Sequence, residues 1–189
     1  MEIELRAFID NFEEIEATLQ KIGAKLTGTI EILDLWFCDK NSTKIEQVRQ
    51  HEAGSYGIRI RRSRKDGQEI IEMNSKVLET KGDHNVFHEY ETEIKDLEQG
   101  RKILESIGFK VFCTVDKKRK IFEFENCTVN LENIKGFRPA VELEIIADKN
   151  IEDHKTYLKE LLDKLGIKEE DKIEKSITYL YMEEFCFKE

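Results

Sequence analysis

Charged and apolar side chains alternate in the stretch EIELRAF, residues 2–8. Successive side chains of a β-strand point to opposite faces of the sheet. This period of two therefore predicts a strand that carries Glu2, Glu4 and Arg6 on one face and apolar side chains on the other. The same alternation returns along the chain, so we expect a protein dominated by an antiparallel sheet.

Several later segments place blocks of charge on one strand face. The charged residues of these blocks are Arg59 and Arg61, then Glu89, Glu91 and Glu93, then Lys117 and Arg119, then Glu132, and finally Glu142 and Glu144. A sheet with its charged face in water explains any one of these strands. The whole set is harder to explain in this way, because like charges two residues apart on one face repel and need counter-ions.

A barrel closed around these faces would hold acidic and basic side chains in its lumen. Carboxylates bind hard cations such as Mg²⁺ or Mn²⁺, while arginine and lysine bind phosphate oxygens. Such a lumen suits a polyanion that is bridged by a divalent metal ion.

Helical periodicity interrupts the strands at four places. Apolar residues recur at helical spacing between Asn11 and Gly23 and again between Asp96 and Gly108, which are typical residues for starting and ending helices. Two further helices are expected near residues 153–165 and 175–186. The residues Lys65-Asp66-Gly67 predict a hairpin turn between strands 56–62 and 68–74. Other strands are expected at residues 29–38, 109–124, 127–132 and 140–147. Residues 39–55 show no clear pattern, and no break in composition divides the chain. We therefore predict one α+β domain over residues 1–189.

Composition excludes several classes of protein. The 189 residues include 40 acidic and 31 basic side chains, which give a net charge of −9, and 39% of the residues are hydrophobic. The acidic balance argues against a protein that coats nucleic acid. Neither a membrane span nor a secretion signal is present in this sequence, so we expect a cytoplasmic protein. The four cysteines and four histidines are too scattered for a zinc site or a disulfide framework, which predicts free thiols.

The charged blocks, taken in order, resemble the CYTH superfamily, which unites class IV (CyaB-type) adenylyl cyclases with thiamine triphosphatase and other triphosphate tunnel metalloenzymes. The family's opening E-x-E-x-K strand is similar to residues 2–6, its L-R-I-R strand to residues 58–61, and its V-x-K-x-R strand to residues 115–119. The final E-I-E strand resembles residues 142–144, and KSITYL at residues 175–180 is similar to the K-S-Y-x-x-L of CyaB-type sequences. The resemblance covers residues 2–182.

This resemblance implies a closed eight-stranded antiparallel β-barrel, with helices packed outside, whose lumen binds a nucleotide or another triphosphate. The side chains implied to bind the phosphates are Arg6, Arg59, Arg61, Lys76, Lys117 and Arg119. Those implied to hold Mg²⁺ or Mn²⁺ are Glu2, Glu4, Glu132, Glu142 and Glu144, supported by Glu89, Glu91 and Glu93. Catalytic roles are expected for Glu4, Arg61 and Lys76.

Four functions remain open at this point. An adenylyl cyclase would convert ATP to cyclic AMP and pyrophosphate, and the length and whole-chain pattern favour it. A triphosphatase would hydrolyse the terminal phosphate of tripolyphosphate, thiamine triphosphate or a nucleotide in the same lumen. The third candidate is a non-catalytic barrel that binds a nucleotide or polyphosphate without turning it over. The fourth is an acidic sheet protein that mediates protein contacts. A homodimer would agree with the resemblance.

Overall fold

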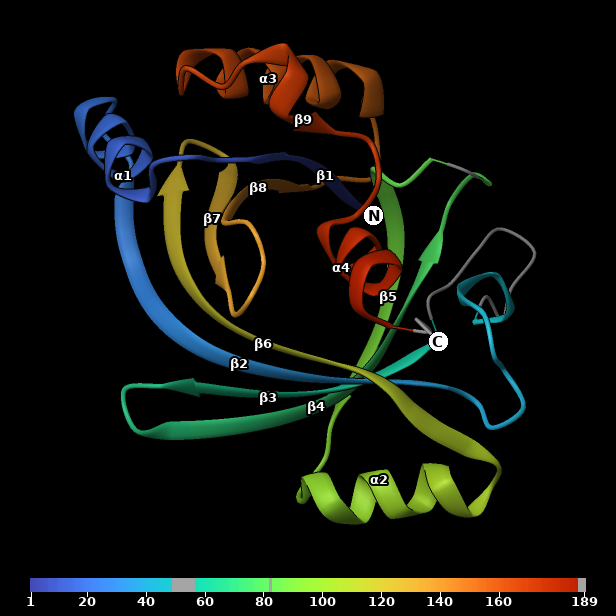
Figure 1. Cartoon of the computed structure of the whole chain (residues 1–189). Helices are drawn as coiled ribbons and strands as arrows, with labels where there is room; N and C mark the ends of the chain where they lie inside the picture. The colour runs from blue at the N-terminus through green and yellow to red at the C-terminus, as the bar shows by residue number, and fades with distance from the viewer. Residues whose placement is uncertain (49–56, 82, 187–189) are drawn as a thin grey trace.

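A closed β-barrel forms the centre of the molecule (Figure 1). The computed structural model describes residues 1–48, 57–81 and 83–186. Its barrel strands pair antiparallel in the order β5-β4-β3-β2-β6-β7-β8-β1, and β1 also pairs with β5, which closes the ring. The predicted closed eight-stranded barrel is confirmed. The strands are β1 (Glu2–Phe8), β2 (Lys25–Asp39), β3 (Ile58–Lys65), β4 (Gln68–Leu78), β5 (Val86–Glu93), β6 (Phe109–Phe124), β7 (Cys127–Ile134), β8 (Ala140–Ile146) and the two-residue β9 (Lys172–Ile173), which pairs with β1.

The helices begin where the sequence offers capping side chains. Asn11 accepts a hydrogen bond from the backbone N–H of Glu14, and Asp96 accepts one from that of Gln99. Each bond satisfies an N–H that has no partner within its helix, so both helices start as predicted. The helices are α1 (Phe12–Lys21), α2 (Leu97–Ser106), α3 (Ile151–Lys164) and α4 (Ile177–Phe185), with 3-10 turns η1 (Ile45–Gln47) and η2 (Glu169–Asp171).

The apolar strand faces point outward and are covered by helices. Ile3 and Leu5 of β1 lie in one buried cluster with Leu19 of α1 and Leu158 of α3. A smaller cluster joins Ile60 of β3 to α2 on another side of the barrel. Because alternate side chains point to opposite faces, covering the apolar face from outside directs the charged face into the lumen.

Helix α4 differs from the other three helices because it lies across one end of the barrel. Its side chains Ile177 and Met182 are buried against Trp36 and Phe87, which extend from the inner face of the strands. Figure 1 shows α4 within the ring of strands, whereas α1, α2 and α3 lie around it. Apolar residues thus line this end of the lumen, and α4 covers them.

Several boundaries differ from the sequence prediction. Strand β2 begins at Lys25 instead of residue 29, because its pairing with β6 continues through a register shift between Leu26 and Gly28. Within the unpatterned stretch 39–55, η1 is described, while residues 49–56, including the predicted start of β3, lie outside the described residues. The cysteines are free thiols, as predicted.

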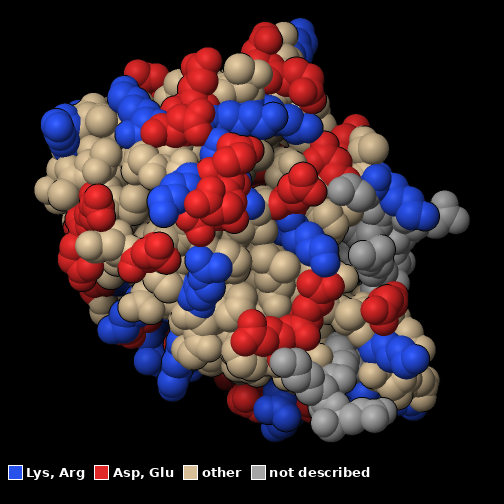
Figure 2. Space-filling view, turned by 45° about the horizontal axis from the view of Figure 1, so that its top comes forward, with Lys and Arg blue, Asp and Glu red and all other residues tan. Residues whose placement is uncertain are grey.

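The surface carries both signs of charge. Figure 2 shows acidic and basic side chains interspersed over the face in view, so the net charge does not gather there as one acidic field. None of the described helices is both long enough and apolar enough to span a bilayer.

Candidate functional site

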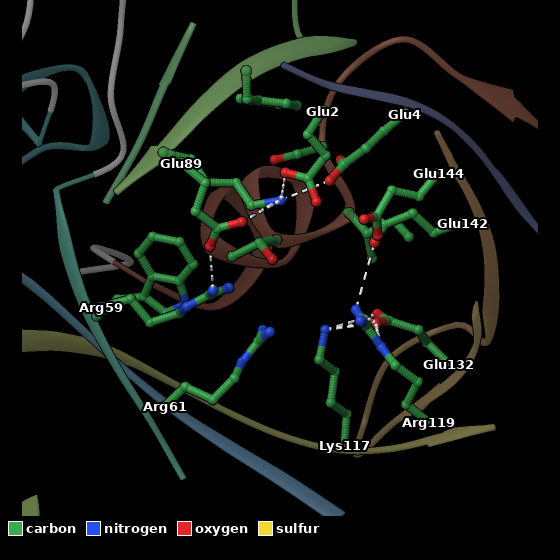
Figure 3. A pocket seen from close by; sticks show the side chains of 16 residues that line it. Glu2, Glu4, Arg59, Arg61, Glu89, Lys117, Arg119, Glu132, Glu142 and Glu144 are labelled. Atoms are coloured by element: carbon green, nitrogen blue, oxygen red, sulfur yellow. Dashed lines mark hydrogen bonds and ion pairs between the residues drawn. The ribbon is translucent and has the colours of Figure 1, made fainter. Parts of the chain in front are cut away.

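The barrel encloses a cavity that is lined mainly by charged side chains (Figure 3). Eleven of the predicted site residues line it, and they come from all eight barrel strands except β2: Glu2, Glu4, Arg59, Arg61, Lys76, Glu89, Lys117, Arg119, Glu132, Glu142 and Glu144. Trp36, Phe87 and the start of α4 (residues 176–178) complete the lining. The start of α4 therefore closes one end of this cavity, which is called the tunnel below.

Strand register brings these side chains together. In the β1–β8 pair, Glu4 lies opposite Glu144, and in the β6–β7 pair, Arg119 lies opposite Glu132. Residues directly opposite in an antiparallel pair point to the same face. The tunnel thus collects charges from strands that lie far apart in the sequence.

One side of the tunnel is acidic. Ligand oxygens of Glu2, Glu4 and Glu144 all lie within 4.8 Å of one another. The Lys76 ammonium lies between two of them, with Nζ 2.5 Å from Glu2 Oε2 and 2.6 Å from Glu4 Oε1. Clustered carboxylate oxygens are the donors that Mg²⁺ and Mn²⁺ prefer, so these residues fit a hard divalent cation.

The crowding of carboxylates raises several pKa values. Burial, together with the charge of Glu4, raises the pKa of Glu2 to about 9. Burial and Glu4 also raise the pKa of Glu142 and of Glu144 above the usual carboxyl range. Burial opposes ionisation of Glu4 as well, but Lys76 and Arg6 outweigh it and hold the pKa of Glu4 well below its usual value. With a pKa of about 9, Glu2 therefore keeps its proton at neutral pH, whereas Glu4 is ionised.

The other side of the tunnel is basic, and Figure 3 shows it facing the acidic side. Arg59 lies with its guanidinium 5.2 Å from the centre of the Trp36 ring and donates from Nε to Asn74 at 2.8 Å. Lys117 donates to both oxygens of Glu132 at 2.7 and 2.9 Å, and Arg119 donates from Nε to the same carboxylate at 2.8 Å. One carboxylate thus holds two cations in place, and both cations line the tunnel.

Arg6 departs from its predicted position in the tunnel wall. Its side chain is fully buried and is not among the residues that line the cavity. It donates to the backbone oxygen of His84 at 2.8 Å and to Glu4 Oε2 at 2.6 Å. Arg6 therefore lies behind Glu4 and fixes that carboxylate, because the loop that precedes β5 closes over this part of β1.

The three glutamates of β5 also separate. Glu89 lines the cavity and accepts a hydrogen bond from Arg59 at 3.1 Å. Glu91 and Glu93 share its face but are exposed farther along β5, beyond the cavity lining. Strand β5 extends beyond the cavity, and Glu91 borders a second hollow at the mouth of the barrel with Glu2, Glu89 and Glu144.

Asp34 is a site residue that sequence reasoning missed. It is 1% exposed, and its carboxylate accepts two hydrogen bonds from Arg61, at 2.7 and 2.8 Å. Burial opposes its ionisation, but Arg61 and Arg59 hold its pKa well below the usual range. The available signal was a single acidic residue between Leu33 and Leu35 in an otherwise apolar strand segment.

Asn130 is a second residue that the sequence analysis did not identify. It lies opposite Glu142 on the neighbouring strand and is 1% exposed. Both polar atoms of its amide lack a hydrogen-bond partner among the described residues. A buried amide without partners is unusual and points to a water or ligand contact at this place.

Comparisons with known proteins agree with this fold. A family model described as "CYTH domain" matches residues 1–177. A relative from Methanocaldococcus jannaschii, named "Putative adenylate cyclase MJ0240", is 25% identical over 186 residues, which cover 95% of this chain and 98% of the relative. The solved structure of the PH1819 protein from Pyrococcus horikoshii has a TM-score of 0.81 at 20% identity and covers 97% of this chain and 99% of its own. A Hippeastrum structure, described as a "Putative adenylyl cyclase" with a dominant triphosphatase activity, has a TM-score of 0.65 at 16% identity over 96% of this chain and 94% of its own.

Proposed function

The chain belongs to the CYTH domain family, and we propose that it is a divalent-metal-dependent enzyme that acts on a triphosphate inside its barrel. The leading reaction is the conversion of ATP to cyclic AMP and pyrophosphate. Hydrolysis of a terminal phosphate is the second candidate, because the Hippeastrum structure that shares the fold is described as having a dominant triphosphatase activity. The relative that matches nearly the whole chain carries the cyclase name, which favours the first reaction.

The observation that carries this proposal is the separation of charge within one tunnel. A cluster of carboxylates (Glu2, Glu4 and Glu144) faces a cluster of cations that includes Arg61 and Arg119. Triphosphates are recognised by arginine and lysine together with divalent cations that bridge their oxygens. Carboxylates alone would suit a metal ion, and basic side chains alone would suit an anion. This tunnel holds both clusters and therefore suits a metal ion and a triphosphate together.

The chain's own residues supply most of the chemistry. Arg59, Arg61 and Arg119 orient the phosphate groups and stabilise the charge that develops on the leaving pyrophosphate. Glu2, Glu4 and Glu144 would hold the divalent cation, which when bound supplies Lewis-acid stabilisation of phosphoryl oxygens. In the cyclase reaction the ribose 3′ oxygen forms a bond to the α-phosphorus as the bond to pyrophosphate breaks. In the triphosphatase reaction a water oxygen attacks the terminal phosphorus instead.

Product analysis separates the candidate functions. Purified protein is incubated with ATP, tripolyphosphate or thiamine triphosphate in the presence of Mg²⁺ or Mn²⁺. Cyclic AMP with pyrophosphate supports the cyclase, and orthophosphate supports the triphosphatase. Saturable binding without any product would identify a binding module and overturn the assignment as an enzyme.

Substitution of Arg59 by alanine is expected to weaken tripolyphosphate binding by about tenfold or more. Hydrogen bonds to charged groups contribute about 1.5–3 kcal/mol, and about 1.4 kcal/mol corresponds to tenfold in affinity. Calorimetric titration with tripolyphosphate measures the change. Arg62→Ala is the matched control. Arg62 lies three residues after Arg59 on β3, and its side chain is on the outer face of the barrel beside Glu69. Equal affinity of Arg59→Ala and the unsubstituted protein would count against the tunnel as the binding site.

Metal binding is expected to strengthen as the pH rises from about 6 towards 9. Glu2 has its pKa raised to about 9, so it carries a proton across this range in the metal-free protein. A divalent cation needs the carboxylate, and its binding therefore releases a proton whose removal becomes easier at higher pH. Titration with Mg²⁺ at pH 7 in two buffers of different ionisation enthalpy counts the protons released. Glu2→Gln is expected to reduce that number, and heats independent of the buffer would contradict the prediction.

A further inference from the structure

The tunnel wall changes from charged to apolar as β2, β3 and β4 continue beyond the basic side chains. Ile30 lies opposite Arg119 in the β2–β6 pair, and Ser63 follows Arg61 by two residues on the same face of β3. Ser63 in turn lies opposite Ile70 of β4. Pairing therefore places these side chains on the inner face of the sheet, toward the end of the barrel away from α4.

These side chains border a hollow of their own. It is lined by Ile30, Ser63, Lys65, Asp66, Gln68 and Ile70. Ile70 is 47% exposed, although it lies on the same strand face as the half-buried Glu72, which faces Arg61. None of the described helices covers this face here, in contrast to the opposite end of the tunnel, where α4 buries the apolar residues.

One edge of the hollow is held in place by a lysine. Lys65 extends across Gly28 of β2, where a Cβ atom would lie 2.6 Å from its Cε atom. The Nζ atom of Lys65 donates to the backbone oxygen of Thr27 at 3.1 Å. The ammonium is therefore occupied at the rim, and the aliphatic part of the chain forms one side of the hollow.

The hollow lies next to the residues that would bind the phosphates, along the same strands. Two residues along a strand span about 6.6 Å, so Ser63 lies about that far beyond Arg61 on β3. A triphosphate held by Arg61 and Arg119 would direct the group at one of its ends onto Ile30 and Ile70. An inorganic chain of phosphates has nothing to bury there, whereas an aromatic or heterocyclic group does.

We propose that the apolar shelf formed by Ile30, Ser63, Lys65 and Ile70 binds the organic group of an organic triphosphate. This inference rests on the proposed function and extends it, because it assigns substrate selection to residues outside the charged tunnel. The shelf contributes to the binding of nucleoside or thiamine triphosphate and contributes nothing to the binding of tripolyphosphate.

The test measures how one substitution changes the binding affinities of three ligands. Ile70→Ala is suitable because a half-exposed side chain can be shortened without opening the core. Calorimetric titrations in EDTA, where metal-dependent turnover does not consume the ligand, are made with ATP, thiamine triphosphate and tripolyphosphate. We expect Ile70→Ala to weaken binding of at least one organic triphosphate by about tenfold, since removing methylene groups from a pocket costs this order of affinity. Tripolyphosphate binding should stay within about twofold by the same reasoning.

Controls separate failure of the shelf from failure of the proposed function. Ile103→Ala on α2 removes a similarly exposed isoleucine outside the barrel and should change none of the three affinities. Ile70→Asp provides a second variant, which places a negative charge on the shelf and should weaken the organic ligands further. If all three ligands bind and Ile70→Ala weakens all of them equally, or none, the shelf is wrong while the tunnel assignment stands. If none of the three binds to the unsubstituted protein, with or without Mg²⁺, the proposed function falls and the shelf with it.

Discussion

Replacing Asp34 by alanine is expected to lower the free energy of unfolding by about 3–5 kcal/mol, which is the usual cost of removing one partner from a buried ion pair. Asp34 is the carboxylate that Arg61 contacts through two hydrogen bonds, and Arg59 lies 4.0 Å from it. Without Asp34, two buried guanidinium groups would face each other with less negative charge between them. Urea unfolding followed by circular dichroism measures the change.

A bound anion should reverse part of this loss. Tripolyphosphate supplies negative charge beside Arg59 and Arg61, so it should raise the thermal midpoint of Asp34→Ala more than that of the unsubstituted protein. Glu31→Ala is the matched control, because Glu31 lies in the same strand but forms an exposed ion pair with Lys118. Its removal should leave the unfolding midpoint unchanged, since exposed pairs contribute little. A stability of Asp34→Ala equal to that of the control would show that the two arginines do not need this carboxylate.

Substitution of Glu4 by glutamine is expected to reduce kcat/KM at limiting Mg²⁺ by about 100-fold or more. Loss of residues that merely orient metal ligands costs about 10–100-fold, and Glu4 is proposed to contact the metal itself. The amide also has no negative charge to offer Lys76 and Arg6, both of which bond to the Glu4 carboxylate. Steady-state rates over a range of Mg²⁺ concentrations measure the loss, and high Mg²⁺ should recover part of it.

The matched control for Glu4→Gln is Glu93→Gln. Glu93 points from β5 on the same face as Glu89, but it is exposed and lies beyond the cavity lining. We expect its activity to stay within about twofold of the unsubstituted protein, because an exposed charge is well screened. The thermal midpoint of Glu4→Gln has to be measured alongside, so that lost folding is not mistaken for lost metal binding. Full activity of Glu4→Gln at limiting Mg²⁺ would exclude Glu4 from the metal site.

Strand parity, which is the odd or even position of a residue along its strand, accounts for most of what could be predicted about the tunnel. Residues such as Arg59 and Arg61, or Glu142 and Glu144, share a face because of their spacing alone. Their outer neighbours are apolar, so covering that face with helices directs the charges inward. The inward direction of these charged side chains could therefore be predicted without knowing how the strands pair.

Parity could not distinguish residues that share a face but differ in depth along the barrel. Glu89, Glu91 and Glu93 have the same parity, yet only Glu89 lines the cavity. Arg6 has the same parity as Glu2 and Glu4, but it is buried under the backbone of His84. Depth depends on where neighbouring strands and loops end, and these limits are set by pairing between distant segments.

The sequence by itself determined an alternating sheet, its charged and apolar faces, and the residues of each sign, because side-chain direction in a strand is a local property of the backbone. Only the tertiary structure decided which opposite charges meet, such as Asp34 with Arg61, 27 positions away. It also decided that α4 covers one end of the barrel and leaves the apolar shelf at the other end open. Such contacts join segments that are remote in the chain, and their energies depend on the closure of the barrel through β1 and β5, which no local pattern specifies.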